Sequence, residues 1–164
     1  EKYIDYLNKE ISKYISKILV NESNAKDTKY ISALFKVCGN LERISDHAVN
    51  LGEYAQTMQA QGIALSDAEM DEIKEMQATS MEALKALEAI ASTSQKDIRQ
   101  IKTLEQKIDD MTEKYRSHQL ERMQKNLCSA EGCVIFSEML TDFERIGDHI
   151  LNIGQEMGRG KVSA

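Results

Sequence analysis

Apolar residues recur at steps of three and four along most of this chain of 164 residues. This spacing puts them on one face of a helix, because an α-helix completes a turn every 3.6 residues. Short polar stretches interrupt the pattern four times. The sequence therefore predicts an all-α fold with no sheet and with five helices, at about residues 1–20, 25–60, 67–91, 95–126 and 131–157.

The interruptions carry start signals for helices. Ser66 with Glu69, and Ser94 with Asp97, have the spacing of a capping box, in which the serine and the acid each bind a free backbone N–H. Ser129 stands where it could cap the last helix. The chain has no proline, which agrees with long uninterrupted helices.

Two segments of the chain repeat each other. Residues 40–53 and 142–155 are identical at seven of 14 positions. Upstream of them, residues 1–5 and 105–109 share their glutamate, isoleucine and aspartate positions. So much identity between long segments indicates a duplicated unit.

The duplication predicts the domain organisation. We expect tandem antiparallel three-helix bundles, with a first repeat of two helices at 1–62 and a second repeat of three helices at 63–164. The first bundle would lack its first helix, since the helix expected at about 67–91 in the second repeat has no counterpart before the helix at about 1–20. A two-helix layer leaves an apolar strip exposed, which we expect a second copy of the chain or the third helix to cover. The expected strip includes parts of Ile11, Ile18, Leu34 and Leu51.

Each repeated segment contains an acid followed four residues later by aspartate. Two such residues lie one turn apart on the same helix face, at the edge of the apolar arc, where like charges repel unless a cation joins them. Oxygen ligands of this kind suit hard cations. The spacing therefore predicts a divalent or iron-type metal ion held by the carboxylates of Glu1 and Asp5, Glu42 and Asp46, Glu105 and Asp109, and Glu144 and Asp148.

Other interpretations of these residues stay open. A single pair of acids is usually a solvated helix face, so the metal prediction depends on the repetition. Arg43 and Arg145 could instead neutralise the acids of a neighbouring helix, giving a salt-bridge network without metal. His47 and His149 follow the aspartates, and their direction on the helical wheel favours an inter-bundle or surface position over an outer-shell metal ligand.

Enzyme chemistry is disfavoured. Carboxylate-bridged dimetal enzymes use a Glu-x-x-His motif, but Ser45 and Gly147 stand three residues after Glu42 and Glu144. The sequence contains no Ser-His-Asp, P-loop or glycine-rich nucleotide motif. A net charge of −6 disfavours binding to nucleic acid. A purely structural bundle, with the acids in salt bridges, is a further alternative.

The three cysteines do not indicate a disulfide framework. Cys38, Cys128 and Cys133 are few and odd in number, so buried thiols in a reducing compartment are expected. Cys128 and Cys133 have the spacing of half a zinc site, but a second half is missing.

The repeated motifs resemble those of the PhoU family. Leu41–His47 and Phe143–His149 are similar to the family's repeated acidic motif, and Glu1–Asp5 and Glu105–Asp109 to its other signature, on the preceding helix. The likeness covers the whole chain. Within the family, the Asp-His ending and the turn at 126–132 most resemble the cytosolic C-terminal domain of bacterial sodium/phosphate cotransporters.

The resemblance implies two three-helix bundles, with multinuclear metal clusters at the E-x-x-x-D motifs in some members. It implies control of phosphate transport or phosphate signalling, in the cytoplasm at the inner face of the cell membrane. The implied partner is the membrane transporter portion of the same polypeptide, or a separate phosphate transporter or sensor, with a homodimer also considered. The alternative is a free-standing PhoU regulator of phosphate signalling.

Overall fold

The computed structural model describes residues 2–21, 24–92 and 98–159, and in these ranges it contains helices and no strand. The predicted all-α class is confirmed, and the predicted bounds agree to within a few residues. The helices are α1 (Lys2–Asn21), α2 (Ala25–Gln61), α3 (Asp67–Ser92), α4 (Arg99–Gln124) and α5 (Ala130–Arg159).

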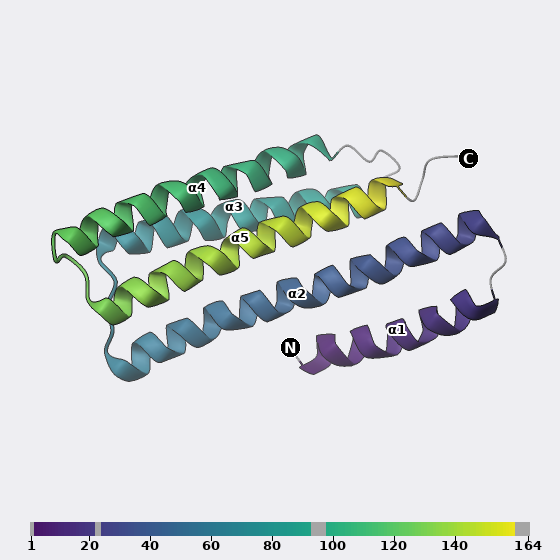
Figure 1. Cartoon of the computed structure of the whole chain (residues 1–164), viewed down its shortest axis with the longest axis horizontal. Coiled ribbons are helices and arrows are strands. Elements are labelled where there is room, and N and C mark those ends of the chain that lie inside the picture. Colours follow the sequence, from purple (N-terminus) through teal and green to yellow (C-terminus); the bar gives the residue numbers. More distant parts are fainter. Residues whose placement is uncertain (1, 22–23, 93–97, 160–164) are drawn as a thin grey trace.

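Helices α3, α4 and α5 form a three-helix bundle, and α2 lies along the side of α5 (Figure 1). Helix α1 folds back along the N-terminal half of α2 and, among the described residues, packs on no other helix. The chain is therefore a two-helix hairpin attached through α2 and α5 to a complete bundle.

The predicted helix caps form where their residues are described. The backbone N–H of Ser66 donates to Glu69 Oε2 at 2.7 Å, and the N–H of Glu69 donates to Ser66 Oγ at 3.3 Å. Ser129 Oγ accepts from the N–H of Gly132 at 3.0 Å. The second predicted capping box, Ser94 with Asp97, lies outside the described residues.

The core lies inside the α3–α4–α5 bundle. Its fully buried side chains come from all three helices and include Met76, Ile101, Ile108, Phe136 and Ile150. Burying each of these side chains stabilises the fold by about 1.5–3 kcal/mol. The α1–α2 hairpin is thinner, and its described buried apolar residues are Ile15 and Ala33.

A polar seam joins α2 to α5. His47 Nδ1 lies 2.6 Å from Asp142 Oδ1, and Asn50 donates to the same oxygen at 3.2 Å. His149 Nδ1 lies 2.9 Å from Asn40 Oδ1, and the two imidazole rings stack with centroids 5.7 Å apart. Burial, followed by the nearby His47, lowers the pKa of His149, which favours a neutral ring. Both histidines therefore hold α2 against α5. This agrees with the inter-bundle position that the helical wheel favoured.

The first repeat has an open apolar surface. A groove of about 490 Å³ runs between α1 and α2, and another of about 560 Å³ lies between α2 and α3 over α5. Of the expected strip, Ile11 is 41% exposed and Leu34 is 40% exposed, whereas Ile18 and Leu51 are partly buried. The option that the third helix crosses to cover this strip is wrong, because α3 packs on α4 and α5. The expectation that a second copy of the chain covers the strip stays a prediction.

The expectation of free thiols is wrong for two cysteines. Cys128 and Cys133 form a disulfide across the start of α5, with Cα atoms 6.4 Å apart. Helix α5 begins at Ala130, so its first turn brings Cys133 back over the preceding turn and next to Cys128. Cys38 is a free thiol, half-buried on α2.

Two glycines at matching places in the repeats test how differently the repeats are packed. A Cβ added to Gly52 would meet nothing within 4 Å, whereas one added to Gly154 would lie 3.1 Å from Cδ1 of the buried Ile101. We expect Gly52→Ala to raise the free energy of unfolding by about 0.5–1 kcal/mol, because alanine favours the helix. Gly154→Ala should raise the free energy of unfolding by at least about 0.5 kcal/mol less than Gly52→Ala does, because Ile101 must move. Urea denaturation measures both, and equal gains would contradict the packing difference.

The polar seam gives a second prediction. Asp142→Ala should lower the free energy of unfolding by about 2–3 kcal/mol, because it leaves His47 and Asn50 without their buried partner. Asn40→Ala, which removes the bond to His149 and an exposed bond to the backbone oxygen of Lys36, should cost about 1 kcal/mol. Urea denaturation compares them, and an Asp142→Ala effect no larger than that of Asn40→Ala would argue against the seam as an anchor of α2.

Candidate metal site

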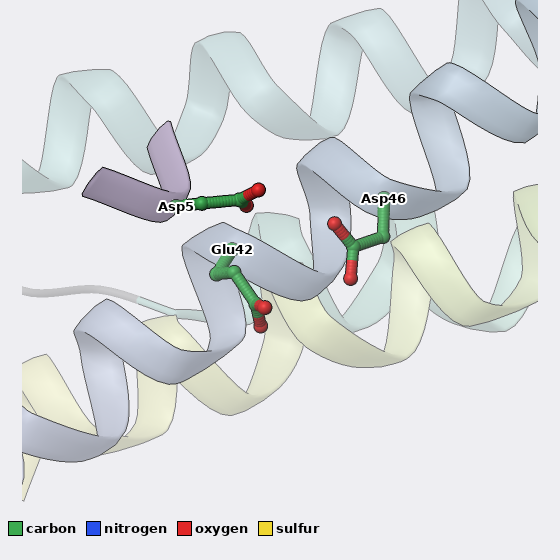
Figure 2. Close-up of side chains that lie close together, drawn as sticks. All are labelled: Asp5, Glu42 and Asp46. Atoms are coloured by element: carbon green, nitrogen blue, oxygen red, sulfur yellow. The ribbon is translucent and has the colours of Figure 1, made fainter. Parts of the chain in front are cut away.

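Three carboxylates from two helices converge in the first repeat. Asp5 comes from α1, and Glu42 and Asp46 stand one turn apart on α2 (Figure 2). One carboxylate oxygen of each lies within 4.8 Å of the others, and the described part of the chain contains no other such group of three acids, histidines or cysteines. Asp5 is exposed, and Glu42 and Asp46 are half-buried. We call these three residues the first acid site.

The local fold explains this convergence. Helix α2 runs antiparallel to α1, so the start of α1 lies beside the middle of α2 (Figure 1). The i, i+4 spacing on α2 then brings a carboxylate oxygen of each of its acids within 4.8 Å of one of Asp5. Glu1, the remaining predicted ligand of this repeat, lies outside the described residues.

The second acid site consists of Glu105 and Asp109 on α4 with Glu144 and Asp148 on α5. Burial, followed by the charges of Asp109 and Asp148, raises the pKa of Glu105. Burial, followed by the charges of Asp148 and Glu144, raises the pKa of Asp109. The acids of the two helices therefore lie near enough to repel one another, as the sequence predicted.

Arginines accompany the second acid site. Arg116 on α4 donates to Glu144 Oε2 at 2.9 Å and to Thr141 Oγ1 at 3.1 Å. Arg145 donates to Asp148 Oδ2 at 3.3 Å. Salt bridges are therefore part of this site, but the arginine that reaches across to the neighbouring helix is Arg116, whereas Arg145 pairs within its own helix. Within the described ranges, no lysine or arginine forms an ion pair with the acids of the first acid site.

The donor set of the first acid site fits a hard cation. Oxygens bound to one ion at 2.0–2.6 Å are separated by at most about 5 Å, and those of the three carboxylates lie within 4.8 Å. Three carboxylates without a paired cation also carry excess negative charge, which an ion of charge two or three would offset. Asp5, Glu42 and Asp46 are thus the residues that would hold such an ion.

Sequence reasoning missed Arg116 and Thr141. The two histidines, Asp142 and Asn40 were visible as repeated positions, but their bonds between α2 and α5 were not. Extending the alignment of residues 1–5 with 105–109 toward the C-terminus would have placed Arg116 opposite Ser12. The sequence therefore shows that Arg116 has no counterpart in the first repeat. It does not show the contact between Arg116 and Glu144, because that contact depends on how α4 and α5 pack.

A family model described as "PhoU domain" matches residues 1–55 and 73–157, which is most of the chain and includes both acid sites. The chain belongs to the PhoU family. The resemblance of the repeated motifs is thereby confirmed at the level of the family.

Known relatives agree with this assignment. The chain is 27% identical over 158 residues to the phosphate-specific transport system accessory protein PhoU homolog 1 of Thermotoga maritima, covering 94% of this chain. It spans 66% of the length of that relative. The crystal structure of the phosphate transport system regulatory protein PhoU from Streptococcus pneumoniae has the same fold, with a TM-score of 0.79 at 16% identity. That match covers 98% of this chain and 75% of the other.

Among the described residues, no helix has an apolar stretch long enough to cross a membrane.

The crowding of acids in the second site can be measured in metal-free protein. Because the pKa of Asp109 is raised in the folded state, the folded protein takes up protons at this group more readily than the unfolded chain. The free energy of unfolding should then fall as the pH rises from the ordinary aspartate pKa through the raised one. Asp109→Asn should flatten this fall and stabilise the protein at pH 7 by roughly 0.5 kcal/mol. Urea denaturation at several pH values, with Glu88→Gln at an exposed acid of α3 as control, checks both.

Proposed function

We propose that this PhoU-family chain is a non-catalytic regulatory module of a phosphate transport system, acting at the cytoplasmic face of the membrane. We further propose that its first acid site binds a divalent or iron-type cation. The regulatory part of this proposal is supported by the match of the PhoU family model to both repeats. The convergence of Asp5, Glu42 and Asp46 within 4.8 Å supports the metal part.

The relatives favour an accessory regulator over a cotransporter domain. Their names describe an accessory protein and a regulatory protein of phosphate transport systems. The likeness to cotransporter domains depended on the histidine after each aspartate and on the turn at 126–132. In the structure His47 and His149 hold α2 against α5, which gives these histidines a role in the fold that needs no membrane portion.

A bound cation would also give the module a way to respond to phosphate. Carboxylates alone repel a phosphate anion, whereas a multivalent cation held by them reverses the local charge. Phosphate sensing at this site would therefore require the metal, and the carboxylates would hold the metal in place. The dimetal enzyme alternative stays disfavoured, because Ser45 offers no imidazole ligand to this site.

Metal analysis of protein purified without chelator tests the metal part. The wild-type chain should retain a stoichiometric metal ion, and the double variant Glu42→Gln with Asp46→Asn should lose it from the first acid site, because the amides keep the shape but remove the charge. Glu53→Gln, an exposed acid on the same helix, is the matched control and should leave binding unchanged. Equal metal content in the double variant and the control would reject this site.

A transport assay in the source cell tests the regulatory part. Loss of the chain should uncouple phosphate uptake from the external phosphate concentration, and wild-type protein should restore the coupling. Restoration by the Glu42→Gln, Asp46→Asn variant as well would show that regulation does not need the first acid site. Unchanged uptake after loss of the chain would overturn the regulatory proposal itself.

A further inference from the structure

The outward face of α1 carries a strip of lysines. At about 100° per residue, six residues of α1 fall within an arc of about 80° and extend along about 27 Å of the helix. They are four lysines, a tyrosine and a valine, namely Lys2, Tyr6, Lys9, Lys13, Lys17 and Val20. All six are exposed, Tyr6 by 59% and Val20 by 84%. The buried Ile15 lies on the opposite side of the helix, toward α2. We call these six residues the basic strip.

The repeat-related helix α4 has no such strip. Residues 105–109 correspond to residues 1–5, which fixes the equivalent positions on α4. They hold glutamines, acids and a serine, namely Gln106, Asp110, Glu113, Ser117, Glu121 and Gln124. These side chains are also exposed. The same face of the same fold can therefore be acidic, so the fold itself does not require the lysines of α1.

The basic strip makes its surroundings positive in a chain whose net charge is −6. The acid at its edge is Glu10, whose Oε1 accepts from Lys13 Nζ at 2.6 Å. The hydrogen bond and the charge of Lys13, followed by the charges of Lys9 and Lys17, lower the pKa of Glu10. Helix α2 stands between α1 and the three-helix bundle (Figure 1). The acids of the bundle therefore lie at least a helix diameter of about 10 Å away, which is the Debye length at about 0.1 M salt, and are largely screened from the strip.

We propose that the basic strip docks the chain on an anionic lipid surface. This inference rests on the proposed function, which brings the chain to the membrane, and it names the surface of the chain that meets the lipid. Lysine ammonium groups are attracted to lipid phosphates, while their alkyl stems lie along the boundary. Tyr6 in the strip, with the exposed Tyr3 and Tyr14 beside it, adds rings with an apolar body and a polar hydroxyl, which suit the headgroup region.

The shape of the strip favours a lipid surface over an acidic protein partner. None of its six residues lines the groove between α1 and α2, so the strip is a convex helix face. A straight helix can lie on a bilayer along its whole length, which brings all four lysines to the anionic surface together. A protein partner is held mainly by a few anchor residues in pockets, and this face offers none to receive them.

Co-sedimentation with lipid vesicles tests the proposal. Vesicles of phosphatidylcholine mixed with phosphatidylglycerol supply the anionic surface, and vesicles of phosphatidylcholine alone supply the neutral one. A chelator is present, so that no divalent cation bridges the acids of the chain to the lipid. At about 0.1 M salt the chain should bind the anionic vesicles only, and about 1 M salt, where the Debye length is about 3 Å, should release it.

Substitutions within the strip identify it as the docking surface. Each lysine near an anionic surface strengthens binding by about fivefold, so Lys9→Gln with Lys17→Gln should weaken binding by about 25-fold. Lys85→Gln with Lys102→Gln is the matched control, because it removes the same charge from exposed positions on α3 and α4. The control should leave binding unchanged. Circular dichroism of each variant checks that its helices are intact.

The outcomes separate this inference from the proposed function. Absence of vesicle binding, equal binding to neutral and anionic vesicles, or equal losses in the two double variants would each overturn the docking role of the basic strip. Binding to soluble poly-glutamate but to neither kind of vesicle would also overturn it, in favour of an acidic protein partner. The regulatory proposal would stand in all these cases, because it depends on the transport assay. Vesicle binding by a chain whose loss leaves phosphate uptake unchanged would overturn the regulatory proposal alone.

Discussion

The structure depends on α5 burying three of its sides at once. It packs against α3 and α4 inside the bundle and against α2 on the outside. Its approach to α4 needs Gly147 and Gly154, where an added Cβ would come within 3.2 and 3.1 Å of isoleucines on α4. With three sides committed, the charged residues of α5 lie along the edges between its contacts or, as Asp142 does, find a partner within a contact.

That constraint sets the electrostatics of the second acid site. Burial of Ile146 and Ile150 fixes the rotation of α5 and so places Glu144 and Asp148 opposite the acids of α4. Each buried isoleucine stabilises the fold by about 1.5–3 kcal/mol, whereas repulsion between partly exposed acids costs a few tenths. Packing therefore decides the geometry, and the crowded carboxylates are tolerated as a consequence. Arg116 then relieves part of the repulsion from the neighbouring helix.

Periodicity and capping predicted the helices because both are local: the capping box at Ser66 and Glu69 needs only three residues of spacing. The repeat predicted which acids belong together, since it compares equivalent positions. Contacts set by packing were not predictable in this way. The bond from His47 to Asp142 spans 95 residues, and the pairing of Cys128 with Cys133 depends on where α5 begins. Likewise, the two-helix composition of the first repeat predicted an exposed apolar surface. It did not predict that α3 packs on α4 and α5 and leaves that surface open.

The two repeats thus carry the same acidic motif in different surroundings. The second is packed on three sides and partly neutralised by its own arginines. The first is an open hairpin in which α1 contacts α2 alone among the described helices, and its acid site joins those two helices through Asp5. A cation bound there would link α1 to α2, while without it the three like charges push the helices apart. The proposed cation would therefore act on the least supported helix of the fold, where a change of position costs the least stability.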